Sequence, residues 1–183
     1  MNYLAPNFEI LEAGPVTASL VVSANGEAVS SLGNSKTLGN QTDLQMLKWF
    51  RARSEIVLTS GLTAELEGYR HPTQAKLAIL SNTPRTYASL GQDLNRVLFL
   101  SESPSFADAV AQLSAEGYTR IHTEFGPTGF KSLVESSSVD GYVSSTSPEG
   151  ISKFLQSAEL YADKLQALSA DLFVAKVVGR GKA

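Results

Sequence analysis

The chain has 183 residues, of which 43% are hydrophobic and 18% charged, a balance typical of globular proteins that bury a sizeable core. It has no cysteine and only two histidines, His71 and His122, which excludes thiolate and histidine-rich metal sites. The formal net charge of −3 and the scarcity of clustered Lys and Arg argue against nucleic acid as a partner. No apolar stretch approaches the roughly 18 residues of a membrane span, and the first ten residues lack the basic start and apolar core of a signal peptide. We therefore expect a cytoplasmic protein that has no membrane partner.

The first third of the chain changes pattern twice. Residues 16–23, VTASLVVS, are β-branched and apolar and predict a buried strand. Residues 24–41 are rich in Gly, Asn and Ser and predict a loop. A helix is expected from residue 42, because Leu44, Leu47 and Phe50 recur at helical spacing and Met46 and Trp49 widen this apolar stripe. Thr42 or Asp43 is expected to cap its start.

The rest of the chain alternates between strand and helix patterns. The turn and cap residues of two helices support this division. One opens with Ser103 or Ser105, has Pro104 near its start and ends in Gly117, and the next opens with Pro127. Strands are predicted at 55–60, 76–81, 96–101, 119–124, 139–146 and 171–178, and helices at 61–69, 103–117, 127–137 and 152–169. Such alternation predicts a mainly parallel α/β sheet, with an antiparallel edge where the last strand returns. Without a repeat or a linker, we expect one domain over residues 1–183.

Three strand ends carry glycine and suggest ligand contacts. They are SANG at 23–26, TSGLT at 59–63 and EFGPTG at 124–129. In open α/β sheets ligands collect at the carboxyl ends of strands, where glycine lets the backbone approach and helix starts favour anions. Any one of these glycines is most often simple turn geometry. Neither phosphate fingerprint, G-x-G-x-x-G or Walker, is present, and the motifs of common hydrolases are absent as well.

Several conspicuous side chains have ordinary structural readings. His122 lies on a predicted buried strand and is expected to be a hydrogen-bonded core residue, whereas His71 beside Pro72 is expected in an exposed loop. Trp49 and Phe50 lie on the apolar helix face and are expected in the core. Glu124 leaves two alternatives open, because an acid at a strand end either caps the next helix or grips a ligand.

Taken in order, these segments resemble the reductase domain of riboflavin biosynthesis, the C-terminal domain of the bifunctional deaminase-reductase. The resemblance rests on SANG at 23–26, GNSKTLG at 33–39, WFRARSEIVLTSGLTAELEGY at 49–69, EFGPTGFKSLVESSSVDGYVSSTSP at 124–148 and the final DLFVAKVV. It implies a dihydrofolate-reductase-like fold with helices on both faces of the sheet. It also implies an NADPH-dependent reduction of a ribosylaminopyrimidine, like that of the 5-amino-6-(5-phosphoribosylamino)uracil reductases, which opens the sugar to a ribitylamino chain. The family's habit further implies a homodimer.

The resemblance places two groups of residues around the ligands. Those expected near NADPH are Gly61, Thr63, Glu67, Gly126, Pro127 and Thr128. Those expected near the pyrimidine are Asn25, Gly26, Ser35 and Glu124. No catalytic side chain is assigned and no metal is expected, since hydride transfer is the chemistry of the cofactor and the protein supplies orientation. If the turns at 61–63 and 126–128 lay on opposite faces, the cofactor prediction would fail.

The chain departs from the family pattern at four places. Asn25 stands where the family usually has Asp, Phe125 replaces the first Gly of a Gly-Gly pair, and Ser19 lies near the place of a lysine found in some members. Residues 149–169 are helix-rich where the family has a glycine-rich loop. Two alternatives therefore stay open: a non-catalytic or divergent nucleotide-binding relative, and a reductase of another small heterocycle. The helix at 152–169 is expected to pack on the sheet, with a dimer contact as the alternative.

Overall fold

The fold was analysed in a computed structural model that describes residues 6–31, 33–91, 93–101, 105–136 and 139–179. Its strands are β1 (Val16–Val21), β2 (Ile56–Ser60), β3 (Lys76–Leu80), β4 (Val97–Leu100), β5 (Ile121–Glu124), β6 (Asp140–Ser145), β7 (Tyr161–Ser169) and β8 (Leu172–Val178). Its α-helices are α1 (Gln41–Arg53), α2 (Gly61–Glu67), α3 (Phe106–Ala115), α4 (Pro127–Glu135) and α5 (Pro148–Ala158). Short 3-10 turns lie at Phe8–Leu11, Ala88–Leu90 and Asp93–Arg96.

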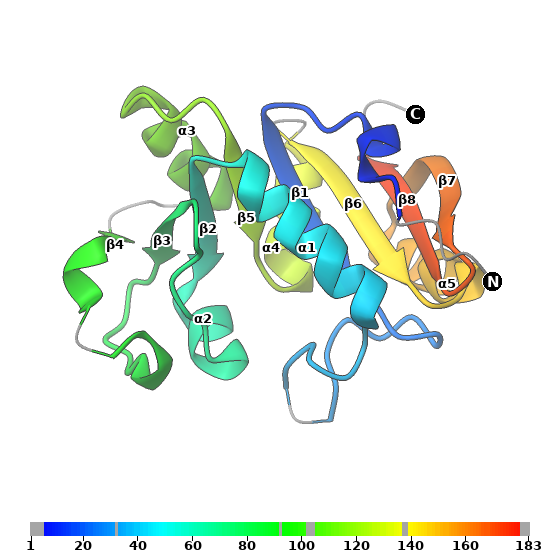
Figure 1. Cartoon of the computed structure of the whole chain (residues 1–183), viewed down its shortest axis with the longest axis horizontal. Helices are drawn as coiled ribbons and strands as arrows, with labels where there is room; N and C mark the ends of the chain where they lie inside the picture. The colour runs from blue at the N-terminus through cyan, green and yellow to red at the C-terminus, as the bar shows by residue number, and fades with distance from the viewer. Residues whose placement is uncertain (1–5, 32, 92, 102–104, 137–138, 180–183) are drawn as a thin grey trace.

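All these strands form one twisted sheet in the order β4-β3-β2-β5-β1-β6-β8-β7 (Figure 1). The strands from β4 to β6 in that order run parallel to one another, while β8 is antiparallel to β6 and β7 is antiparallel to β8. The predicted fold class, a mainly parallel sheet with an antiparallel C-terminal edge, is confirmed. Within the described part of the chain, no helix is both long and apolar enough to cross a membrane.

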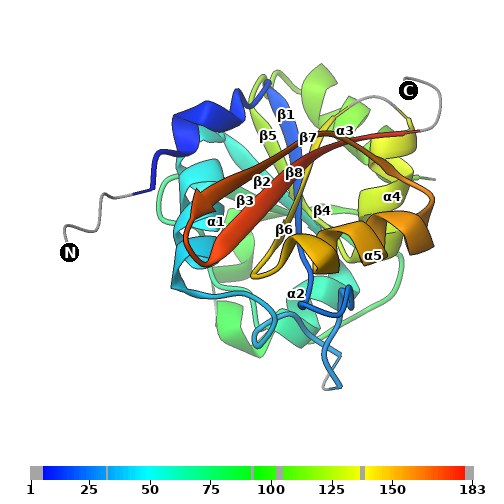
Figure 2. The same ribbon diagram turned by 90° about the vertical axis from the view of Figure 1, so that its right-hand side faces the viewer.

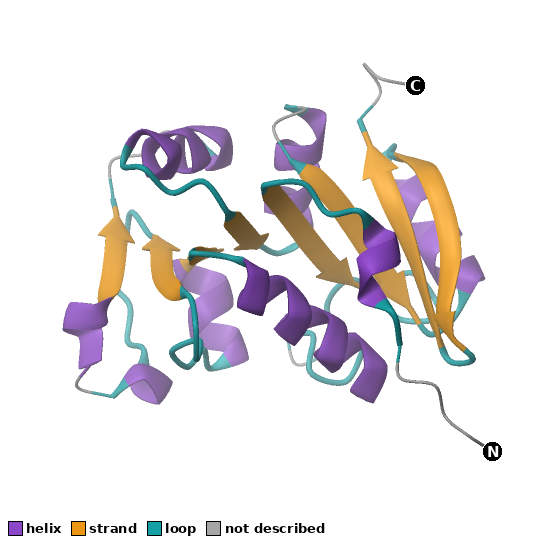
Figure 3. Cartoon of the chain, turned by 45° about the horizontal axis from the view of Figure 1, so that its top comes forward, coloured by secondary structure: helices purple, strands orange, loops and turns teal. Residues whose placement is uncertain are grey.

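Helices cover both faces of the sheet. Figure 2 views the sheet nearly edge-on, with α1 on one side and α4 and α5 on the other, and Figure 3 shows the helices around the strands. Strand β5 explains the division, because side chains alternate between faces. Ile121 packs with α3 and α4 residues, whereas His122 stacks on Phe50 of α1 at 4.8 Å between ring centroids. Phe50 is buried, as expected, and Trp49 is partly buried against the hydrophobic cluster that contains Phe50.

Helix α1 begins one residue earlier than predicted. Its cap is Asn40, whose side chain accepts a hydrogen bond from the amide of Asp43, so the expected caps Thr42 and Asp43 are wrong. Of the two caps expected for the helix at 103–117, Ser105 is the one that caps α3, while Ser103 and Pro104 lie outside the described residues. Pro127 is the first residue of α4, as predicted. The Asp43 carboxylate is thereby left without a capping role.

The predicted helix at 152–169 is wrong in its second half. Helix α5 starts earlier, at Pro148 behind the cap Ser147, and ends at Ala158, followed by the C-cap Glu159, which adopts left-handed backbone with φ 57°. Residues 161–169 form β7, which pairs with β8 through the two-residue turn that begins at Ala170. The stretch has helix-favouring composition, but pairing with β8 overrides that weak preference. Its exposed charged side chains suit an edge strand, which they protect from further pairing.

Candidate functional site

A cavity of about 1000 Å³ lies at the carboxyl ends of the central parallel strands. The ends of four strands contribute Val21, Ser60, Glu124 and Ser144 to its wall. The ends of parallel strands meet at one edge of the sheet, so these residues converge although they are far apart in sequence. The loop after β1 and the helices α1, α2 and α4 close the cavity around them.

The two glycine-bearing turns face this one cavity. Thr63 and the segment Gly126–Thr128 all line it, because β2 and β5 are hydrogen-bonded neighbours that end at the same level. Gly126 is the N-cap of α4 and makes no side-chain cap hydrogen bond, and a Cβ built on it would meet no atom within 4 Å. The first amides of α4 are therefore approachable by an anion.

Gly61 does not line the cavity. It is the first residue of α2, and a Cβ there would lie 2.4 Å from the Ser81 hydroxyl oxygen and 2.8 Å from the Tyr87 hydroxyl. Glycine is needed at this position because these two side chains pack directly against the backbone. The geometry gives Gly61 a packing role beside the turn, while Thr63, two residues further along α2, reaches the cavity.

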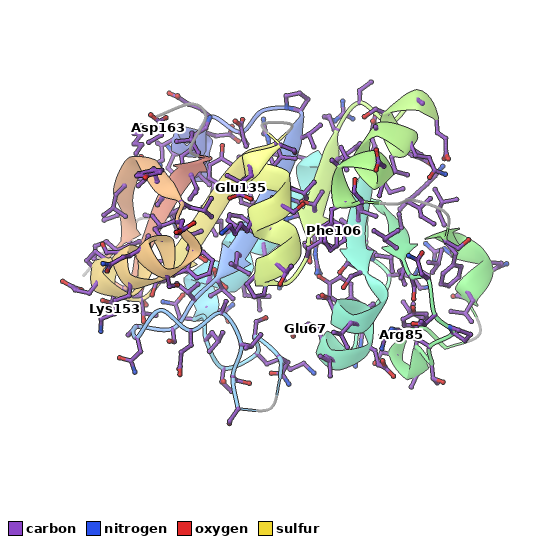
Figure 4. The ribbon with its side chains drawn as sticks, turned by 180° about the vertical axis from the view of Figure 1, so that it is seen from behind. Glu67, Arg85, Phe106, Glu135, Lys153 and Asp163 are labelled. Atoms are coloured by element: carbon purple, nitrogen blue, oxygen red, sulfur yellow. The ribbon has the colours of Figure 1, made fainter. Side chains whose placement is uncertain are left out.

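Glu67 connects the loop after β1 to α2. Its carboxylate accepts a 2.6 Å hydrogen bond from the amide of Ser35, and both residues line the cavity. Figure 4 labels Glu67 on α2 and Phe106 on α3. Phe106 lines the same cavity from the opposite face of the sheet. This hydrogen bond ties the loop after β1 to α2 at the cavity wall. It joins Glu67, expected near the cofactor, to Ser35, expected near the pyrimidine.

Asn25 and Gly26 are not among the cavity-lining residues. Asn25 is exposed in the turn after β1, where its backbone N–H donates a hydrogen bond to the Ser23 hydroxyl oxygen. Gly26 has φ 88° and packs against α5, with a Cβ position 2.9 Å from the Lys153 side chain. The structure therefore separates these two predicted substrate residues from Ser35 and Glu124, which do line the cavity.

Glu124 is the centre of a dense hydrogen-bond network. Its carboxylate accepts two bonds from Arg51, at 2.7 Å from Nε and 2.6 Å from Nη2, and a short bond from the Tyr69 hydroxyl. The Thr59 hydroxyl donates to its backbone carbonyl at 2.7 Å. Burial favours a raised pKa for this carboxyl, but the hydrogen bonds and charge of Arg51 outweigh it and lower the pKa. Glu124 caps no helix; Arg51 and Tyr69 occupy its carboxylate instead.

His122 is a neutral core residue beside this network. Its Nδ1 is 2.8 Å from the Thr17 hydroxyl and its Nε2 is 3.1 Å from that of Ser19, which lines the cavity. Burial lowers its pKa to about 4, so the ring is uncharged near neutral pH. The expectation of a hydrogen-bonded core histidine is confirmed. His71, expected to be exposed, is instead half-buried and lines the cavity.

Comparison with known proteins gives a consistent result at the level of fold. No protein-family model matches this sequence, and no curated protein matches it. The pyrimidine reductase-like protein of Corynebacterium diphtheriae is 19% identical, with a TM-score of 0.62 over 92% of this chain and 93% of that one. The Saccharomyces cerevisiae riboflavin biosynthesis reductase Rib7 is 12% identical, with a TM-score of 0.61 over 91% and 90%. Acinetobacter baumannii RibD is 16% identical, with a TM-score of 0.64 over 91% of this chain and 58% of RibD. This chain has the fold of the riboflavin-biosynthesis reductases.

Phe125, a departure from the family pattern, is accommodated within this reductase fold. Its side chain is buried and packs on Phe106 at 4.7 Å between ring centroids. Among the described residues other than glycine, only Glu12 and Glu159 have positive φ, so Phe125 needs no special backbone. The close neighbour Gly129 makes room for it, since a Cβ there would lie 2.6 Å from that of Phe125.

Three cavity residues to which the sequence reasoning assigned no role in a site are Arg51, Tyr69 and Asp43. Arg51 lies at the end of α1, within the segment WFRARSEIVLTSGLTAELEGY on which the resemblance rests, so a signal for it was present. Tyr69 follows Gly68, a left-handed C-cap that turns the chain back toward the cavity. Asp43 was noticed only as a helix cap, and nothing in the local pattern indicates that Ser144 of β6 would bond to it.

Proposed function

We propose that this protein is an NADPH-dependent reductase of a ribosylaminopyrimidine in riboflavin biosynthesis. The observation that carries the proposal is that Thr63 and Gly126–Thr128 line a single cavity at the carboxyl ends of β2 and β5. These two turns are at least 63 residues apart in the sequence. The reductase fold supports it as well. Hydride transfer is supplied by the bound nicotinamide, so the protein needs to orient two ligands and keep water away.

The cavity residues fit a pyrophosphate-bearing cofactor. The open amides at the start of α4 and the unobstructed backbone of Gly126 accept an anion without a side-chain clash. Besides Arg51, three cationic side chains line the cavity and have no ion-pair partner among the described residues: Lys36, Lys48 and Arg70. In this assignment Thr63, Pro127 and Thr128 contact the cofactor, and Glu67 acts through the loop that it holds.

The pyrimidine is assigned to the part of the cavity near β1, beside the cofactor turns. Ser19 and Ser35 present polar atoms there, and the ion pair of Glu124 with Arg51 gives a fixed floor. Because the Glu124 carboxylate is already bonded, its role is to hold Arg51 and Tyr69 in place. A rigid floor of this kind orients a substrate without taking part in proton transfer.

A cofactor titration tests the proposal. Nicotinamide fluorescence should report NADPH binding to the wild-type chain, and Gly126→Glu should weaken it about tenfold or more, because a carboxylate would face the anion site. Gln156→Glu, which adds the same charge on the exposed side of α5, is the matched control and should bind as the wild type does. Absence of NADPH binding at millimolar concentration would refute the proposal.

Substrate assays separate the remaining alternatives. Oxidation of NADPH with a ribosylaminopyrimidine is expected, and activity only on other heterocycles would favour a different reductase. Binding of NADPH without turnover on any heterocycle would favour a non-catalytic relative. We also propose a cytoplasmic homodimer, which light scattering at two concentrations tests, with a strictly monomeric chain as the contrary result.

A further inference from the structure

A buried histidine is connected to the cavity through a single hydroxyl. His122 is fully buried, with the Thr17 hydroxyl oxygen 2.8 Å from its Nδ1 and the Ser19 hydroxyl oxygen 3.1 Å from its Nε2. Ser19 is only partly buried and lines the cavity. These three side chains therefore form a chain of hydrogen bonds that begins in the core and ends at the cavity wall.

The direction of this hydrogen-bond chain follows from Thr17. Its hydroxyl is buried and has no other hydrogen-bond partner among the described residues, so it donates to Nδ1 of His122 rather than leave its own hydrogen unpaired. Burial lowers the pKa of His122 to about 4, so the ring is neutral and carries its one proton on Nε2. A carboxylate oxygen of Glu124 lies 3.7 Å from Nε2 and favours the N–H at that end as well. His122 therefore donates to Ser19.

Ser19 is left with a hydroxyl hydrogen that no described residue accepts. Its oxygen accepts the hydrogen bond from Nε2 of His122 and keeps one further lone pair. Successive hydrogen bonds polarise one another, so the two donors behind Ser19 make its O–H a stronger donor than that of an isolated serine. Ser19 can thus give a proton to one atom of a ligand and accept a proton from another.

Ser19 also lies where the reacting atoms of the proposed reaction belong. Strand β1 lies between β5, which leads into the cofactor turn at Gly126–Thr128, and β6 (Figure 1). Three residues of β1 line the cavity, and only Ser19 among them is polar. The carbon that receives the hydride must lie between the nicotinamide and the pyrimidine assigned to the β1 side. The Ser19 hydroxyl faces that part of the cavity.

We propose that the Ser19 hydroxyl, held by His122, opens the ribosylamine ring of the substrate by moving a proton from the exocyclic nitrogen to the ring oxygen O4′. The nitrogen lone pair forms the C1′=N bond, the electron pair of the C1′–O4′ bond stays on O4′, and the N–H pair becomes the new lone pair of nitrogen. Ser19 takes the released proton and gives its own to O4′, so atoms and charge balance. The open-chain imine that results accepts a hydride at C1′.

This inference rests on the proposed function and adds two roles to it. Ser19 becomes a catalytic residue, because it touches the atoms between which the proton moves. His122 becomes a positioning residue, because it acts only through the hydroxyl that it orients and polarises.

Exchange between anomers tests this step without the cofactor. A ribosylamine that opens to the imine closes again to either anomer, and each anomer has its own H1′ signal in NMR. With 6-(D-ribosylamino)uracil as the probe, magnetisation exchange between the two signals gives the rate. The wild-type chain should accelerate this exchange about a hundredfold or more over buffer, as general acid–base catalysis does. Ser19→Ala should abolish the acceleration, whereas Ser152→Ala, on the exposed side of α5, should leave it unchanged.

Two variants at His122 distinguish its positioning role from a merely structural one. His122→Leu removes the donor to Ser19 and should slow the exchange about fivefold, as expected for one hydrogen bond, with the affinity for the probe unchanged. His122→Gln, whose side-chain amide can donate in place of Nε2, should restore most of the rate. Ser19→Ala keeps the test independent of any folding defect at position 122.

Three results would overturn the inference: no acceleration by the wild-type chain, an unchanged rate in Ser19→Ala, or equal rates for His122→Leu and His122→Gln. Failure of the proposed function is a separate result, namely absence of NADPH binding, which anomer exchange neither requires nor measures.

Discussion

Two carboxylates at the same edge of the sheet behave in opposite ways. Glu124 ends β5 and Asp43 lies in the first turn of α1, and both line one cavity. Burial acts on both and favours the neutral acid. The pKa of Glu124 is nevertheless lowered, because Arg51 supplies two hydrogen bonds and a charge, while the pKa of Asp43 is raised, because only the Ser144 hydroxyl opposes burial. The hydrogen-bonding partner, more than the depth of burial, decides the direction in which the pKa of each acid shifts.

This difference separates an acid that is bonded through both carboxylate oxygens from one that accepts a single hydrogen bond from the described residues. The carboxylate of Glu124 is satisfied within the protein and helps to fix the end of α1 and the chain after α2 against the sheet. The carboxylate of Asp43 stays partly unsatisfied, which lowers the stability of the folded chain but leaves it available to bind. Sites that bind or react commonly carry such local destabilisation.

The largest expected effect comes from breaking the Glu124 ion pair. Arg51→Met should lower the free energy of unfolding by about 3 kcal/mol, because it leaves a buried carboxylate without its cation. Arg51 is 27% exposed and Glu124 only 6%, so most of the loss arises at the acid. Urea denaturation followed by circular dichroism measures it. The double variant Arg51→Met/Glu124→Leu should recover part of the loss, and a simple sum of two large losses would contradict this account.

A somewhat smaller effect is expected when the acid itself is neutralised. Glu124→Gln should cost about 2 kcal/mol at pH 7, since charged hydrogen bonds to Arg51 become neutral ones. A lowered pKa in the folded state gives stability that is present above the ordinary carboxyl pKa of 4.5 and is lost as the pH falls through the folded value. The difference between variant and wild type should therefore shrink below pH 4.5, and a difference that does not depend on pH would argue against the ion pair.

Removing the second donor to Glu124 should have a modest effect. Tyr69→Phe deletes one hydroxyl that donates to the carboxylate while keeping the ring beside Arg51, whose guanidinium carbon lies 5.3 Å from the ring centroid. We expect a loss of about 1 kcal/mol, as for a single hydrogen bond, in the same urea measurement. Tyr87→Phe, at a tyrosine outside this network, is the control. A loss as large as that of Arg51→Met would mean that Tyr69 supports more than the carboxylate.

The smallest effect should have the opposite sign. Asp43→Asn is expected to raise the melting temperature at pH 7, because it removes a buried charge that lacks a cation. A raised pKa in the folded state means that stability falls as the pH rises through it, so the gain should be greatest at neutral pH and vanish below the ordinary value of 3.8. A lower melting temperature for Asp43→Asn at pH 7 would show that the two acids are alike.

Much of the frame could be predicted because its signals are local. The strand run before Glu124 and the helix-opening Pro127 indicated where β5 ends and α4 begins, and parallel connectivity then placed the turns at 63 and 126–128 at one edge of the sheet. The exception is β7, whose residues favour a helix. Only the hydrogen bonds to β8 make it a strand, and such pairing leaves no trace in composition.

The site itself divides along the same line. The amino-acid sequence by itself determined the order of the elements apart from β7, the burial of His122 and the convergence of Glu124 with Gly126–Thr128, since each depends on nearby residues and on the topology. Only the tertiary structure decided that Arg51 and Tyr69 take up Glu124, that Asn25 and Gly26 lie off the cavity, and that Asp43 remains partly unbonded. Those outcomes depend on which side chains of separate elements come within hydrogen-bond distance, and a few ångströms of helix placement determine that.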